Sequence, residues 1–172
     1  MIEQRRALGL DGHDEVWDGI YRVTPHAGLW HAAVQTRLGA VLDRIAAPLG
    51  LAVTAEFNIG VKADHRIPDL GVHRSLPDET YVPTAAMVVE VLSPDDDSFK
   101  KFDFYAEHGV DEIMVADPVE RTIRIWVLQP SLSFFKGATT PRRPAAYGET
   151  DFSVLLSTYT PDLVAAVNWP AA

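Results

Sequence analysis

The fold class of this 172-residue chain is decided by residues 85–92, which read AAMVVEVL and are followed by Ser93 and Pro94. A continuous apolar run rich in β-branched residues predicts a strand that is buried on both faces. Glu90 is the exception, and a carboxylate in an enclosed space is costly unless it is paired, protonated or bound to a metal. Pairing with an arginine from a neighbouring element would explain Glu90 as well as a metal site would.

Helices and strands are predicted on both sides of this strand. Apolar residues recur at spacings of three and four from Trp30 to Leu49, which predicts one long helix closed by Pro48 and Gly50. Before it, Asp18-Gly19 separates two short apolar runs, a pattern typical of a two-stranded hairpin. Residues 51–60 and 66–73 are β-compatible runs separated by a polar turn at 62–65.

The second half of the chain continues the alternation. Asp95, Asp96 and Asp97 suit the N-cap and first turn of a helix from about residue 99 to 108. Residues 112–116 and 122–128 predict a hairpin, and residues 129–150 a loop with at most one weak strand. Arg142-Arg143 in that loop could touch a phosphate backbone, although a solvated loop is the simpler interpretation. The order predicts a single α/β domain over residues 1–172, with a central mixed β-sheet flanked by helices.

Composition excludes several classes of site. The chain has no cysteine, which excludes disulfides, thiolate zinc sites and cysteine nucleophiles. Its histidines show no HExxH pattern, and Ser93 lacks the context of a serine-hydrolase elbow. Residues 1–12 hold no signal-like apolar stretch and no segment approaches the ~20 apolar residues of a membrane span, so we expect a cytoplasmic protein. The formal charge of −9 argues against tight non-specific binding of DNA.

Two further residues join Glu90 as candidates. Asp69 follows Pro68 in a short strand candidate, where alternation places it on one face with the small Gly71; the plainer interpretation is a Pro-Asp turn. Lys101 shares a helical stripe with Tyr105, although most helix lysines are solvated. Together, two acids and a lysine suit phosphodiester hydrolysis, because carboxylates bind Mg²⁺ and a lysine stabilises developing negative charge.

Several motifs resemble the Uma-two family of restriction-endonuclease-like proteins. They are RIPDL at 66–70, VVEVLSP at 88–94, KFDFYA at 101–106, GVDE at 109–112, VADP at 115–118, and Glu15-x-x-Asp18-Gly19. The resemblance covers roughly residues 14–128 and implies a PD-(D/E)xK nuclease fold with a divalent-metal site.

The resemblance also implies roles for individual residues. Asp69 and Glu90 would be the two metal-binding acids of the motif. Leu92 stands where the motif has its lysine, so Lys101 on the following helix would take that role. His31 would contact substrate or metal, or else cap its helix. Glu15 would support the site, or else pair with an arginine.

The expected function is therefore that of an endonuclease dependent on Mg²⁺ or Mn²⁺. Its substrate would be nucleic acid, DNA by family analogy, and cutting both strands of a duplex would favour a homodimer. Two alternatives stay open. The displaced lysine and the acidic charge favour a catalytically silent nuclease-fold module for binding or assembly, and the same centre could also hydrolyse another phosphate ester.

Overall fold

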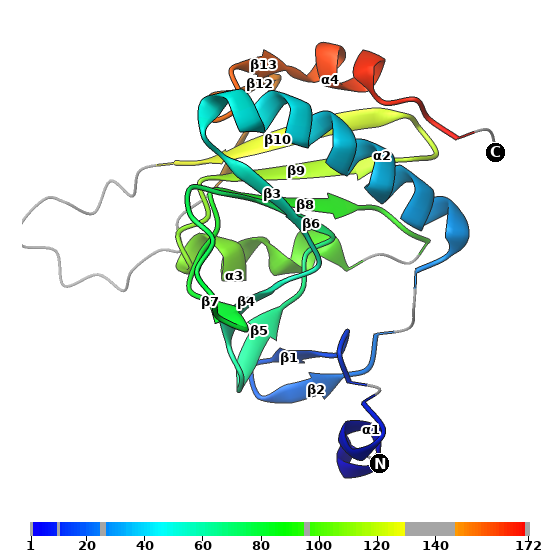
Figure 1. Ribbon diagram of the computed structural model, residues 1–172, viewed down its shortest axis with the longest axis vertical. Helices are drawn as coiled ribbons and strands as arrows, with labels where there is room; N and C mark the ends of the chain where they lie inside the picture. The colour runs from blue at the N-terminus through cyan, green and yellow to red at the C-terminus, as the bar shows by residue number, and fades with distance from the viewer. Residues whose placement is uncertain (1, 10, 25–26, 95–96, 130–146, 171–172) are drawn as a thin grey trace, which may run out of the picture.

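A central six-stranded sheet lies between helices on both of its faces (Figure 1). The computed structural model describes residues 2–9, 11–24, 27–94, 97–129 and 147–170. The sheet has the order β11-β10-β9-β8-β6-β3. Its strands are β3 (Ala52–Ala55), β6 (Leu70–His73), β8 (Met87–Val91), β9 (Glu112–Asp117), β10 (Thr122–Leu128) and β11 (Tyr147–Thr150). The predicted mixed α/β sheet flanked by helices is confirmed.

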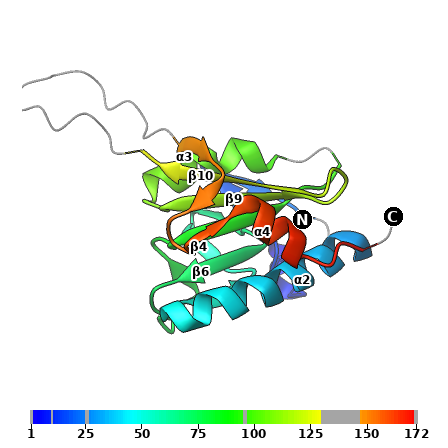
Figure 2. The same ribbon diagram turned by 90° about the horizontal axis from the view of Figure 1, so that it is seen from above.

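The pair β8–β9 is parallel, whereas the other neighbouring strands of this sheet run antiparallel. Parallel neighbours need a crossover connection. Here the crossover consists of the 3₁₀ turn η2 (Ser98–Lys101) and the helix α3 (Phe102–Glu107), and it lies on one face of the sheet. Figure 2 shows α2 (Leu29–Ala46) on the opposite side of the sheet from α3.

The predicted double burial of β8 is confirmed, and its two faces belong to different cores. Met87, Val89 and Val91 pack with α2 and with α4 (Thr160–Ala166). Val88 packs on the other face with α3 residues such as Tyr105. Since side chains alternate along a strand, Glu90 points to the α3 face, as Val88 does.

A smaller five-stranded sheet, of order β2-β1-β5-β4-β7, lies beside α3 (Figure 1). Its strands are β1 (Glu15–Trp17), β2 (Ile20–Arg22), β4 (Asn58–Val61), β5 (Asp64–Arg66) and β7 (Tyr81–Val82). The predicted hairpin at Asp18-Gly19 is confirmed, and both turn residues have positive φ, 51° and 78°. Pairing of Val16 with His65 of β5 joins this hairpin to the rest of the sheet.

Residues 66–73 do not form the single strand that the sequence predicts. β5 ends at Arg66, β6 begins at Leu70 in the other sheet, and Asp69 lies in the bend between them. The small Gly71, which alternation places on the face of Asp69, leaves no open space there, because a Cβ at Gly71 would meet the ring of Phe57 at 2.3 Å. The absent side chain accommodates that ring.

The run 51–60 is likewise divided, between β3 and β4 of different sheets, and β5 begins inside the predicted turn at 62–65. Helix α2 is followed by a 3₁₀ turn, η1 (Ala47–Leu49), and closed by Gly50 at φ 73°. The other elements are α1 (Ile2–Ala7), β12 (Phe152–Ser153) and β13 (Thr158–Tyr159). Asp95, Asp96, Arg142 and Arg143 lie outside the described residues. In the part of the chain described, no helix has the length and apolar character needed to cross a bilayer.

Candidate active site

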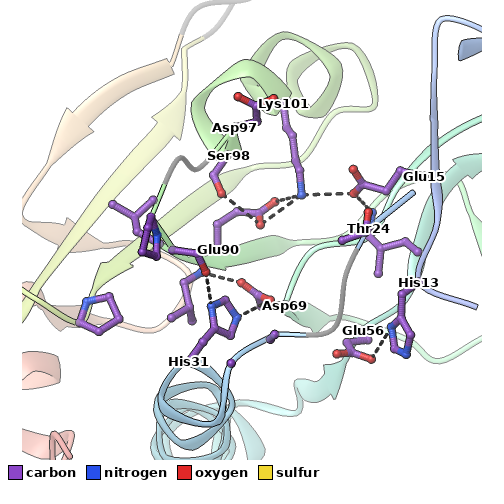
Figure 3. A pocket seen from close by; sticks show the side chains of 18 of the residues that line it. His13, Glu15, Thr24, His31, Glu56, Asp69, Glu90, Asp97, Ser98 and Lys101 are labelled. Atoms are coloured by element: carbon purple, nitrogen blue, oxygen red, sulfur yellow. Dashed lines mark hydrogen bonds and ion pairs between the residues drawn. The ribbon is translucent and has the colours of Figure 1, made fainter. Parts of the chain in front are cut away.

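A cavity of about 1100 Å³ opens at the C-terminal end of β8. Its walls come from that strand end, the first turn of α2, the β1–β2 hairpin, η2 and the turn between β9 and β10. The predicted residues Glu15, His31, Asp69, Glu90 and Lys101 all line it, although they come from five separate segments (Figure 3).

Glu90 lies at the floor of the cavity and is 3% exposed. The hydroxyl of Tyr105 donates a hydrogen bond to its Oε1, and the Nζ of Lys101 lies 3.2 Å from the same atom. The Ser98 hydroxyl lies 3.5 Å from Oε2. All three partners belong to the crossover, which has to return over the face to which Glu90 points. The connection that parallel pairing requires therefore also supplies the partners of the buried acid.

Lys101 bridges two carboxylates, because its Nζ also lies 3.2 Å from Oε1 of Glu15. Its side chain is 12% exposed, whereas that of the neighbouring Lys100 is 66% exposed. Glu15 in turn accepts hydrogen bonds from the backbone N–H of Ile67 at 2.6 Å and from Nε1 of Trp17 at 2.7 Å. Lys101 is thus not a solvated surface lysine, and the cation that both glutamates share is a lysine rather than an arginine.

Asp69 is held from two sides at the edge of the same cavity. Its Oδ2 accepts the backbone N–H of Val91 at 2.7 Å, which ties it to the residue after Glu90. Its Oδ1 lies 2.9 Å from Nε2 of His31, and the other ring nitrogen of His31 lies 2.8 Å from Oγ of Ser93. The structure therefore places His31 as a link between the Asp69 bend and the end of β8.

The pKa values reflect three carboxylates gathered around one ammonium group. Burial raises the pKa of Glu90 to about 7; Lys101 opposes this, while the charges of Asp69 and Glu15 add to it. Burial acts to lower the pKa of Lys101, but Glu90, Glu15 and Asp69 outweigh it and raise that pKa above its usual value. Burial and the Glu90 charge raise the pKa of the Tyr105 hydroxyl, which stays protonated.

The donor set fits a hydrated divalent cation. Among the described residues no group of three or more histidines, aspartates and glutamates is arranged to hold a metal ion. Mg²⁺, however, keeps several waters and commonly binds proteins through one or two carboxylates. Asp69 and Glu90 both line the cavity and offer such oxygens. Burial of Glu90 disfavours its charged form and the charges of Asp69 and Glu15 add to this effect, which a bound cation would relieve.

The sequence did not predict the contacts of three residues, Tyr105, Ser93 and Asp97. Tyr105 was noted only for its spacing from Lys101, but that i, i+4 spacing is what brings both side chains to Glu90. Ser93, set aside as a nucleophile, hydrogen-bonds His31. Asp97, expected at the N-cap or in the first turn of a helix, binds Lys100 at 2.5 Å and Arg22 at 3.3 Å. Asp97 occupies the N-cap position of η2 without a side-chain capping bond.

Comparison with known proteins identifies the family. The model of the Uma2 (Uma-two) family, described as "Putative restriction endonuclease", matches residues 4–154, and the chain belongs to this family. A solved structure from Anabaena variabilis, described as "a putative nuclease belonging to DUF820", is similar in fold with a TM-score of 0.62. It is 16% identical in sequence, and the match covers 90% of each chain. A search of curated proteins found no match.

Proposed function

We propose that this member of the Uma2 family is a divalent-metal-dependent endonuclease that hydrolyses phosphodiester bonds of DNA. One observation supports the proposal: a single cavity is lined by Asp69, Glu90 and Lys101, which come from separate segments of the chain. The acidic side chains among the described residues of this cavity outnumber the cationic ones. Asp69 and Glu90 would hold Mg²⁺ or Mn²⁺. The bound ion would supply an activated water and offset negative charge on the phosphate.

The chain's own residues hold this centre in position. Lys101, fixed between Glu90 and Glu15, presents a positive charge near the reacting phosphate without needing to reorganise. Tyr105 fixes one oxygen of Glu90. His31 and the Val91 amide orient Asp69. Such support of metal-binding carboxylates normally tunes their orientation and affinity.

The substitution Glu90→Gln tests the proposal. We expect it to abolish plasmid cleavage in Mg²⁺ or Mn²⁺ and to weaken metal binding measured by calorimetry, because an amide cannot supply the charge. A suitable control is Glu112→Gln, on the neighbouring strand β9. Glu112 is 2% exposed and accepts hydrogen bonds from Ser153 and from the Leu155 N–H, outside the cavity. Unchanged nuclease activity of purified Glu90→Gln protein would overturn the proposal.

A non-catalytic binding or assembly module is the second candidate. It is favoured because Lys101 already neutralises part of the charge of Glu90 and Glu15, and because the chain carries a formal charge of −9. Calorimetry with Mg²⁺ and Mn²⁺ separates the two candidates. A wild-type protein without affinity for either ion cannot carry out the proposed chemistry.

The choice of DNA as substrate and a homodimeric state extend the proposal. A symmetric dimer would place two centres on the two strands of a duplex. Assays of small phosphodiesters beside plasmid DNA test the substrate, since the same centre could act on another phosphate ester. Light scattering coupled to gel filtration tests the dimer.

A further inference from the structure

The charged side chains in the walls of the cavity are predominantly acidic. Among the described residues that line it, seven are aspartates or glutamates, whereas the cationic side chains are Lys101 and Arg22. A phosphodiester is an anion, so its binding here requires a cation that is able to reach it. Lys101 is 12% exposed and lies between two carboxylates, which leaves little of its charge for binding substrate in the ground state.

Arg22 is held beside the candidate centre by the hairpin. In the β1–β2 register it stands directly opposite Glu15, and directly opposed side chains lie on the same face of a strand pair. Its guanidinium lies 3.9 Å from the ring centre of Trp17, whose own Nε1 binds Glu15. Trp17 therefore positions both Glu15 and Arg22, while the Arg22 side chain stays 44% exposed at the cavity.

The ionic partner of Arg22 is suited to exchange. Its Nη1 lies 3.3 Å from Oδ2 of Asp97, whose side chain is 39% exposed, and ion pairs this exposed contribute little. Asp97 is also bound by Lys100 at 2.5 Å. If Arg22 leaves, Asp97 consequently keeps a cationic partner and is not left as an unpaired charge.

We propose that Arg22 is the substrate-binding residue of this cavity, exchanging Asp97 for a phosphate of the nucleic-acid backbone next to the bond that is cut. This inference rests on the proposed function. A planar guanidinium can donate two parallel hydrogen bonds to the oxygens of one phosphate. The present contact of Arg22 with the exposed carboxylate of Asp97 is a single ion pair. Arg22 binds the substrate, and Lys101 remains with Glu90 and Glu15.

Binding of a short fluorescein-labelled DNA duplex, with Ca²⁺ in place of Mg²⁺, tests the inference by anisotropy. Arg22→Ala should raise Kd about 10- to 100-fold, the loss expected for one charge-assisted contact. It should also reduce the slope of log Kd against log salt concentration by about one, the signature of one lost phosphate contact. The matched control is Arg74→Ala, which removes an exposed Arg–Asp pair of 2.6 Å outside the cavity.

A second variant covers the case in which Arg22→Ala disturbs the hairpin. Asp97→Asn should lower Kd in the wild-type background more than in the Arg22→Ala background, because it frees Arg22. Glu120→Gln removes an equal charge from another part of the cavity wall, and it should change Kd by the same factor in the wild-type and Arg22→Ala backgrounds. Circular dichroism confirms folding of each variant.

The outcomes separate this inference from the proposed function. Mg²⁺-dependent cleavage by the wild type, with Arg22→Ala matching Arg74→Ala in Kd and salt slope, overturns the role of Arg22 alone. DNA binding that depends on Arg22 but is never followed by cleavage supports Arg22 and overturns the nuclease proposal. A wild type that binds no DNA overturns both.

Discussion

At the scale of the residue, Glu90 determines what this site can do. It is the acidic residue of the apolar run 85–92, and the fold surrounds it with one ammonium, one phenol and one serine hydroxyl. Burial, with the added negative charge of Asp69 and Glu15, raises the pKa of Glu90, so Glu90 gains a proton at a higher pH than an exposed glutamate would. A metal ion would compete with that proton for the same carboxylate.

The pKa of Glu90 predicts how stability depends on pH in metal-free protein. Native Glu90 keeps its proton up to a pH of about 7, whereas an unfolded glutamate releases it near 4.5. Between these values the unfolded state binds fewer protons, so the free energy of unfolding contributed by Glu90 falls as the pH rises and is constant above about 7. In urea unfolding with chelator present, the free energy of unfolding should fall less between pH 4.5 and about 7 for Glu90→Gln than for the wild type. Equal pH slopes would contradict the prediction.

At the scale of the element, the crossover and the hairpin close the site from two sides. The η2–α3 crossover brings Lys101 and Tyr105 over the face to which Glu90 points. The β1–β2 hairpin, a separate element, brings Glu15 to Lys101 (Figure 3). Helix α3 also packs into a hydrophobic core through Phe104 and Tyr105, whereas each strand of the hairpin has three residues. The ion pair and hydrogen bonds of Glu15 therefore also fasten the hairpin to the rest of the molecule.

The turn of the hairpin offers a test of this coupling. Gly19 has φ 78° with open space around its Cβ position, and a side chain there would strain the left-handed backbone. Gly19→Ala should lower the free energy of unfolding by about 1–2 kcal/mol. It should also lower cleavage activity, because Glu15 loses its fixed position. Gly50→Ala, with φ 73° and equally open space after η1, should cost similar stability without the loss of activity. Equal losses of activity in the two variants would refute the coupling.

At the scale of the whole molecule, the acidic chain makes a bound cation important for both substrate binding and stability. The formal charge is −9, and the cavity walls repeat this imbalance. An anionic substrate is repelled by this negative charge. Bound metal ions and Arg22 would offset the repulsion locally. A ligand that binds only the native state raises its stability by mass action.

Metal binding should therefore raise the melting temperature. At about 100 times its Kd, Mn²⁺ would contribute about 2.7 kcal/mol, which for a chain of this length shifts Tm by roughly 5–10 °C. Scanning calorimetry with Mn²⁺ and with excess chelator measures the shift. Glu90→Gln should lose most of it. A shift of equal size in that variant would mean that the ion binds elsewhere.

Local patterns in the sequence determined much of this protein. The buried strand around Glu90, the long helix α2, the Asp18-Gly19 hairpin and the β9–β10 hairpin are all readable from periodicity and turn chemistry, because these signals act over a few neighbouring residues. The motifs also indicated Asp69, Glu90 and Lys101 as candidate site residues.

Only the tertiary structure decided how these residues meet. The break at Asp69, which separates two sheets, is held by hydrogen bonds from Gln35 and from the Val91 N–H that no local pattern encodes. Likewise, the burial of Lys101 rather than Lys100 and the pairing of Asp97 with Arg22 follow from elements brought together across the cavity. The burial and the electrostatic environment of a site residue depend on segments that are distant in sequence, so residue spacing along the chain cannot predict them.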